Sequence, residues 1–136
     1  MDFLKFSLSG FDDFLLYFGL SVGFVVLYLA IYVRITPYRE FALIRAGNPA
    51  AAASLSGSLI GFVLPLASAV VNSVNPWDMA LWAAIALVVQ IVVYLVVRLI
   101  VPDLARHIPE GKVGAGVFLG VVSLAAGILN AASMTY

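Results

Sequence analysis

Small and polar side chains recur at regular spacing in two apolar stretches, and they are the residues best placed to do chemistry. They follow one another at steps of three or four residues, which sets them on one face of a helix. The stretch 50–74 carries Ser54, Gly57, Gly61, Pro65, Ser68 and Asn72, and the stretch 113–136 carries Gly116, Gly120, Ser123, Gly127 and Asn130. We call these two sets the small-residue stripes.

Two roles are open to the small-residue stripes. Glycine lets helix backbones touch, and serine and asparagine form interhelical hydrogen bonds, so the stripes can be packing surfaces. They can instead line a polar path or hold a small solute. Pro65 bears on this choice because it has no N–H to give to the carbonyl of Gly61, which then needs a partner helix, a water or a ligand. Gln90, in a third apolar stretch, faces the same choice, and we expect its amide to point into the bundle.

Basic residues gather around the expected amino termini of the helices 50–74 and 113–136. They are Arg39, Arg45, Arg106 and Lys112. A helix amino terminus attracts anions through its free N–H groups and its dipole. We therefore expect these four side chains to contact the anionic headgroup of a phospholipid, with a specific phosphate-bearing ligand as the alternative.

Residues for catalysis are scarce. The chain has no cysteine and one histidine, His107, which has no second ligand at metal-binding spacing. We find no glycine-rich phosphate loop, nucleophile–base pair or paired carboxylates. We expect no enzyme activity, no metal and no cofactor. The net charge of zero gives no reason to expect nucleic acid as a partner.

Four apolar stretches must position these side chains: 14–33, 50–74, 77–97 and 113–136. About 20 apolar residues in a helix cross a hydrocarbon core. The chain is 64% hydrophobic and 10% charged, whereas a soluble domain carries about 25% charged residues. We therefore predict an all-α membrane protein with four transmembrane helices in one domain, residues 1–136. Asn48-Pro49 and Asn75-Pro76 should open the second and third helices as N-cap and first residue.

The chain also repeats itself. A shift of 64 residues pairs Val33-Arg34 with Val97-Arg98 and Gly47 with Gly111, and six of the 23 positions from 33 to 55 are identical. This predicts two repeated helical hairpins, about 14–74 and about 77–136, in parallel orientation. Basic residues divide six to one in favour of the links within the hairpins, which places these links in the cytoplasm and both termini outside.

The segment YREFALIRAGNPAAAASLSGSLIGFVLPLASAV, from Tyr38 to Val70, and the closing AAGILNAASMTY, from Ala125 to Tyr136, carry a family resemblance. The chain resembles the YjfL-type family of small bacterial inner-membrane proteins, the domain of unknown function numbered 350. The resemblance covers nearly the whole chain. It implies a bacterial inner-membrane location and a two-hairpin repeat, with no catalytic residues to carry over. It also implies occurrence near envelope-stress and polyamine-related genes.

Two functions remain open. In the first, copies associate through the small-residue helices 50–74 and 113–136 and form a passive conduit for an ion or small solute. In the second, the bundle is a non-conducting scaffold or adaptor in an envelope-stress or polyamine-linked system, and its basic links recruit a peripheral cytoplasmic protein. We expect the lipid bilayer and further copies of the chain, in a homo-oligomer, as partners, and a peripheral cytoplasmic protein as a further partner.

Overall fold

The computed structural model of the chain describes residues 2–134, which form helices joined by short links. Within this range four helices are long and apolar enough to cross a membrane, which confirms the prediction of an all-α chain with four candidate spans. They are α1 (Asp2–Ile35), α3 (Pro49–Asn72), α4 (Pro76–Ile100) and α6 (Val113–Ser133). Two further short helices, α2 (Glu40–Arg45) and α5 (Leu104–His107), lie in the links. Thr135 and Tyr136, at the end of the predicted fourth span, lie outside the described residues.

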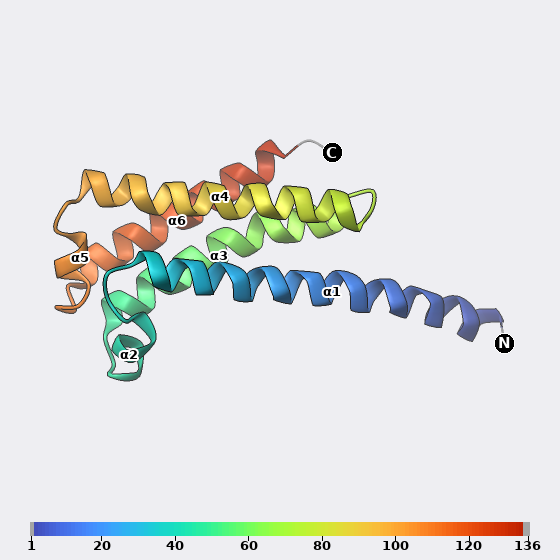
Figure 1. Cartoon of the computed structure of the whole chain (residues 1–136), viewed down its shortest axis with the longest axis horizontal. Coiled ribbons are helices and arrows are strands. Elements are labelled where there is room, and N and C mark those ends of the chain that lie inside the picture. The colour runs from blue at the N-terminus through green and yellow to red at the C-terminus, as the bar shows by residue number, and fades with distance from the viewer. Residues whose placement is uncertain (1, 135–136) are drawn as a thin grey trace.

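The long helices lie side by side and alternate in direction along the chain (Figure 1). α1 and α4 run towards the end of the bundle that holds α2 and α5, which we call the loop end. α3 and α6 start there and return to the opposite end, where a tight link joins α3 to α4. We call this opposite end the turn end.

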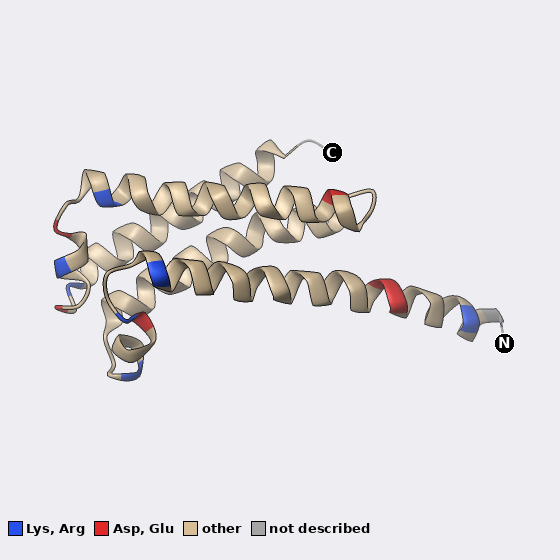
Figure 2. Ribbon diagram, viewed as in Figure 1, with Lys and Arg blue, Asp and Glu red and all other residues tan. Residues whose placement is uncertain are grey.

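Charged residues mark the two ends of the bundle (Figure 2). Lysine and arginine gather at the loop end, except Lys5 near the start of α1, and the long middle stretches of the helices carry no charge. The division of basic residues seen in the sequence is therefore a division between the two ends of the folded chain.

The two asparagine–proline pairs begin helices, as predicted. The side-chain oxygen of Asn48 accepts the backbone N–H of Ala51 at 3.0 Å, and that of Asn75 accepts the N–H of Asp78 at 2.9 Å. Proline follows each asparagine at the first turn of its helix. A proline there loses no helical hydrogen bond because the first N–H groups have no partner in the helix.

The two links at the loop end have the same backbone design. Each short helix is followed by a glycine with positive φ, 86° at Gly47 and 78° at Gly111, a conformation that costs other residues more. Hydrogen bonds of 2.9 to 3.0 Å close both turns in the same pattern: Gly47 N–H to Ile44 O and Asn48 N–H to Leu43 O, then Gly111 N–H to Ile108 O and Lys112 N–H to His107 O. The chain reverses in the same way at two places 64 residues apart.

α3 is the central helix of the bundle. In its most apolar 18-residue window 44% of the residues are buried, against 28% in α4 and in α6 and 6% in α1. The core of the turn-end half contains apolar side chains from α3 and α4: Phe62, Leu66, Ala69, Met79, Ala83 and Ala86. Most of this stretch of α1 is therefore left for lipid or another protein, although Tyr28 and Tyr32, near its loop end, are fully buried.

α1 is also longer than predicted. It begins at Asp2, whereas the apolar stretch in the sequence begins at residue 14. No proline interrupts the residues before this stretch, and extending an existing helix is much easier than starting one. The amino-terminal part of α1 extends beyond the other helices at the turn end (Figure 1).

Candidate functional site

The small-residue stripes of α3 and α6 face each other within a single chain. A Cβ added to Gly57 would collide with the backbone of Gly120, and one added to Gly127 would collide with the backbone of Gly61. Gly116 is in equally close contact with the backbone of Ala50. Close backbone contact of this kind holds helices together in lipid, where the hydrophobic effect gives little attraction between them. We call this interface the α3–α6 seam.

Gln90 of α4 closes the seam from the side. Its side-chain amide donates to the carbonyl oxygen of Gly61 at 3.0 Å and to that of Ser123 at 3.1 Å. The carbonyl of Gly61 receives no hydrogen bond from Pro65, because proline has no N–H. Its hydrogen-bond donor is instead the side chain of Gln90, from a third helix. Gln90 is buried, and its Oε1 atom has no hydrogen-bond partner among the described residues.

Hydroxyl groups continue from the seam towards α1. Ser58 of α3 lies 3.3 Å from Ser123 Oγ and 3.3 Å from the hydroxyl of Tyr32. The ring of Tyr32 meets that of Tyr94 edge-on, with centroids 5.3 Å apart, and that of Tyr28 at 5.8 Å. All five side chains are buried. The bundle therefore contains polar groups in the half that faces the loop end.

A buried carboxyl group lies beyond these tyrosines. Glu40, the first residue of α2, is 1% exposed. Its Oε1 lies 2.5 Å from the hydroxyl of Thr36, which donates to it, and its Oε2 has no partner within the described part of the chain. Burial raises the pKa of Glu40 to about 7 from an ordinary 4.5, and the hydrogen bond from Thr36 opposes this rise. The same burial raises the pKa of Tyr38, which lies between Thr36 and Glu40 in the chain.

The four basic residues predicted to meet an anion fall into two pairs. Arg106 lies 3.6 Å from Asp103 and 3.9 Å from Glu110, and Lys112 lies 3.6 Å from Glu110. Arg39 and Arg45 have no ion pair within residues 2–134. Both line a surface hollow of about 420 Å³, whose polar members also include Thr36, Tyr38 and Glu40.

Three other residues of the stripes form no hydrogen bond with Gln90 or the tyrosines: Ser54 lies in the loop-end half of α3, and Asn72 and Asn130 lie towards the turn end. Ser54 is buried and donates to the carbonyl of Ala51 in its own helix at 3.1 Å. Asn72 is exposed at the turn end and donates to the carbonyl of Ser68 at 3.0 Å. Asn130 is partly buried, and its Nδ2 atom has no partner among the described residues.

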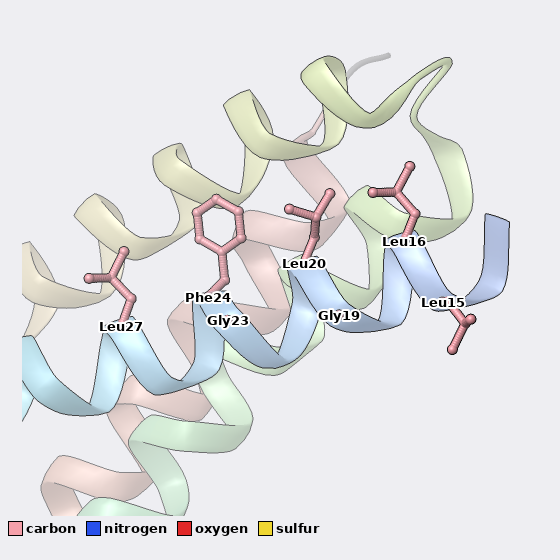
Figure 3. Close-up of a pocket in the computed structure, with 7 residues that line it drawn as sticks. All are labelled: Leu15, Leu16, Gly19, Leu20, Gly23, Phe24 and Leu27. Carbon is pink, nitrogen blue, oxygen red and sulfur yellow. The ribbon is translucent and has the colours of Figure 1, made fainter. Parts of the chain in front are cut away.

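An apolar groove of about 430 Å³ runs along α1 (Figure 3). Leu16, Leu20 and Phe24 point from α1 towards α4, and Leu15 points away. Gly19 and Gly23 lie between them, and nothing lies within 4 Å of a Cβ added to either. Gly19 and Gly23 of α1 therefore have free space beside them, whereas the glycines of the seam are in contact with the backbone of the neighbouring helix.

The site residues predicted from the sequence did not include Glu40, Thr36 or the buried tyrosines near them. One signal could have identified the first two, because Glu40 is the only acidic residue between Arg34 and Asn48 and follows Thr36 by four residues. Its burial depends on how the short helix α2 folds back against the bundle, which hydropathy does not describe.

The comparisons with known proteins give the family. The family model described as Domain of Unknown Function (DUF350) matches residues 6–134. The chain belongs to this family. Two relatives, both named UPF0719 inner membrane protein YjfL, come from Escherichia coli strain K12 and Escherichia coli O157:H7. Each is 45% identical over 120 residues, which cover 88% of this chain and 91% of the relative. No solved structure matches the chain.

The DUF350 match includes every group described above. It runs from α1 through α6 and so contains the seam, Gln90, the buried Glu40 and the hollow with Arg39 and Arg45. The resemblance inferred from the segment 38–70 and the closing residues is confirmed by this match and by the two relatives.

Proposed function

We propose that the protein is a multi-pass protein of the bacterial inner membrane with the loop end in the cytoplasm and both termini outside. The two relatives carry the name inner membrane protein. The clustering of lysine and arginine at the loop end supports the orientation, because basic links stay in the cytoplasm. Single cysteines at Gly10, Ala42, Val74 and His107 test it in this cysteine-free chain. An impermeant thiol reagent should label positions 10 and 74 in intact cells, and labelling of 42 and 107 instead would reverse the orientation.

We further propose that the chain consists of two repeated hairpins, α1–α3 and α4–α6, in parallel orientation. The identical turns at Gly47 and Gly111 support this, as do the shared directions of α1 with α4 and of α3 with α6. The side-chain amide of Asn48 ties the first link to the second, since it donates to the carbonyl oxygens of Ile108 at 2.9 Å and Pro109 at 3.2 Å.

Within the membrane, we propose that the protein is an adaptor that recruits an acidic peripheral protein to the loop end. The observation that supports this most is the different state of the two basic pairs. Arg106 and Lys112 form ion pairs with carboxylates of the chain. Arg39 and Arg45 line the hollow and form no ion pair within residues 2–134, so their charges are available to a partner. Charge complementarity of this kind speeds association and selects partners.

A photoreactive amino acid at Ala42, on the exposed side of α2, tests the adaptor proposal in living cells. We expect a discrete protein adduct that disappears when Arg39 and Arg45 are both replaced by glutamine. The Arg106→Gln variant is the matched control and should keep the adduct. The proposal would be contradicted if no protein adduct formed, or if the adduct persisted without Arg39 and Arg45 but was lost in Arg106→Gln.

A passive conduit for an ion or small solute is the second candidate. It is favoured by the polar groups that extend from Glu40 to Gln90 inside the bundle. The glycines of α3 and α6 contact one another within the chain, so we propose α1, with its open Gly19 and Gly23, as the surface on which copies would associate. Flux of common ions and small solutes in proteoliposomes separates the two candidates. No flux from oligomeric wild-type protein would exclude the conduit.

A further inference from the structure

The carboxyl group of Glu40 lies in an environment that suits a neutral acid better than an anion. A carboxylate has about four acceptor sites, and a buried one needs several donors or a cation to offset lost hydration. Glu40 receives one hydrogen bond, from Thr36, while its Oε2 is buried with no partner in the described structure. No arginine or lysine of residues 2–134 forms an ion pair with it.

The groups around Glu40 are mainly hydroxyls. α1 contributes the tyrosines Tyr28 and Tyr32, and the link that follows it contributes Thr36 and Tyr38. α4 contributes Tyr94 and, one turn further on, Arg98. The arginines of the hollow, Arg39 and Arg45, lie on the solvent side of the same segment.

The two halves of the bundle differ in what they bury. The fully buried polar side chains of the described residues are Thr36, Glu40, Ser54, Ser58, Gln90 and Ser123, and all lie between the middle of the bundle and the loop end. The fully buried side chains of α3 and α4 beyond Gly61 and Gln90 towards the turn end are apolar. Polar side chains are therefore available near Glu40 on the loop-end side, whereas the fully buried side chains of α3 and α4 on the turn-end side are apolar.

We propose that Glu40 is a proton-binding site which exchanges its proton with the loop end of the bundle, through the hollow lined by Arg39 and Arg45, and not with the turn end. On binding, a hydronium ion gives its proton to a carboxylate oxygen of Glu40 and leaves a water molecule and the neutral acid. Release reverses this step and leaves the carboxylate. No other bond changes. This proposal depends only on Glu40 and the residues around it, and it applies whether the protein is an adaptor or a conduit.

Infrared difference spectroscopy of the purified protein in liposomes tests the proton-binding site. A protonated carboxyl group has a C=O band separate from that of a carboxylate, and a pH series follows it. We expect a band that persists near neutral pH and disappears on going to alkaline pH, is absent in Glu40→Gln and is kept in Glu110→Gln, whose carboxyl is exposed. A wild-type protein without this band, or a Glu40→Gln variant that keeps it, would overturn the proposal.

A second variant keeps the test independent of whether Glu40→Gln folds. Thr36→Val removes the hydrogen bond that favours the carboxylate, so the band should persist to higher pH, with proton affinity raised severalfold. An unchanged or lowered midpoint would show that the band belongs to another carboxyl group.

Sidedness is tested with the protein in liposomes whose orientation has been sorted by labelling of a cysteine at Ala42. A pH jump on the side of the loop end should change the band at once, while a jump on the other side should change it only after the pH has equilibrated. An immediate response to both sides would overturn access from the loop end alone. Neither outcome depends on an acidic protein partner, so failure of the adaptor proposal is distinguishable from failure of this one.

Discussion

The side-chain amide of Gln90 lies 3.0 Å from the carbonyl oxygen of Gly61 and donates a hydrogen bond to it. This carbonyl has no helical partner because the residue four positions later is Pro65, which has no N–H. One side chain of α4 thus completes the backbone hydrogen bonding of α3, and the same amide reaches Ser123 of α6. Three helices meet at this point in the middle of the bundle.

Replacing Gln90 by leucine should destabilise the protein by about 1–2 kcal/mol, because the buried carbonyl oxygen of Gly61 loses its donor and that of Ser123 loses one hydrogen bond. The Pro65→Ala variant restores an N–H that can serve Gly61, so the loss from Gln90→Leu should be smaller in a Pro65→Ala background. Unfolding by sodium dodecyl sulfate in mixed micelles measures all four proteins of the cycle. Strict additivity of the two substitutions would show that they do not act on the same carbonyl.

Alanine substitutions should have opposite effects at the glycines of the α3–α6 seam and at Gly19 and Gly23 of α1. Gly61→Ala and Gly127→Ala should destabilise the bundle, because the new Cβ collides with backbone across the α3–α6 seam. Gly19→Ala and Gly23→Ala in α1 meet no atoms within 4 Å, and the better helix propensity of alanine should leave stability unchanged or raise it by up to about 1 kcal/mol. Thermal unfolding in detergent compares the four variants. Equal losses at all four sites would contradict the close contact of the seam.

Stability should fall as the pH rises from about 5 to 8, and Glu40 should be responsible. Since the pKa of Glu40 is raised to about 7, the folded protein holds a proton between pH 4.5 and 7 that the unfolded chain has lost. The contribution of Glu40 to the free energy of unfolding is therefore complete below pH 4.5 and is lost as the pH rises through the raised pKa of about 7. The loss should be at most ~3 kcal/mol, and the Glu40→Gln variant should show a flatter pH profile in detergent unfolding. The Glu110→Gln control should retain the wild-type slope.

The two N-cap asparagines should differ in importance. Asn48→Ala removes a cap and two hydrogen bonds to the second link, whereas Asn75→Ala removes a cap alone. A cap is worth about 1 kcal/mol and each further hydrogen bond about 1 kcal/mol, so Asn48→Ala should cost more. Asn48→Asp keeps the acceptor for Ala51 and loses the donors, which should place its stability between that of wild type and Asn48→Ala. A loss no greater than that of Asn75→Ala would mean that the bridge between the links contributes nothing.

Local signals in the sequence predicted much of the fold. The four long helices follow from the length of the apolar stretches, and two of their starts from Asn48-Pro49 and Asn75-Pro76, because an N-cap needs only its own next three residues. Regular spacing also marked out the small residues that meet at the α3–α6 seam. What spacing could not tell is that the two stripes face one another in one chain rather than between copies.

The carboxyl site could not be predicted in the same way. A glutamate beside two basic residues in a polar link has the pattern of an exposed side chain, and most glutamates are exposed. Glu40 is buried because α2 folds back so that Thr36 and the tyrosines cover it. This depends on how α2 and the link before it pack against the rest of the bundle, which no local pattern encodes.

The length of α1 has a consequence for how the protein sits in a bilayer. At 1.5 Å per residue the part from Phe14 to Ile35 is about 33 Å long, close to the thickness of the hydrocarbon core. Asp12 and Asp13 then lie at the boundary with water, and the helix continues past them towards Asp2. In this continuation Phe3, Phe6 and Phe11 are exposed. Because α1 is continuous through the membrane surface, its amino-terminal part extends beyond the bundle as a rigid helix that carries aromatic side chains. Any tilt of α1 in the bilayer therefore also moves these side chains in the headgroup region.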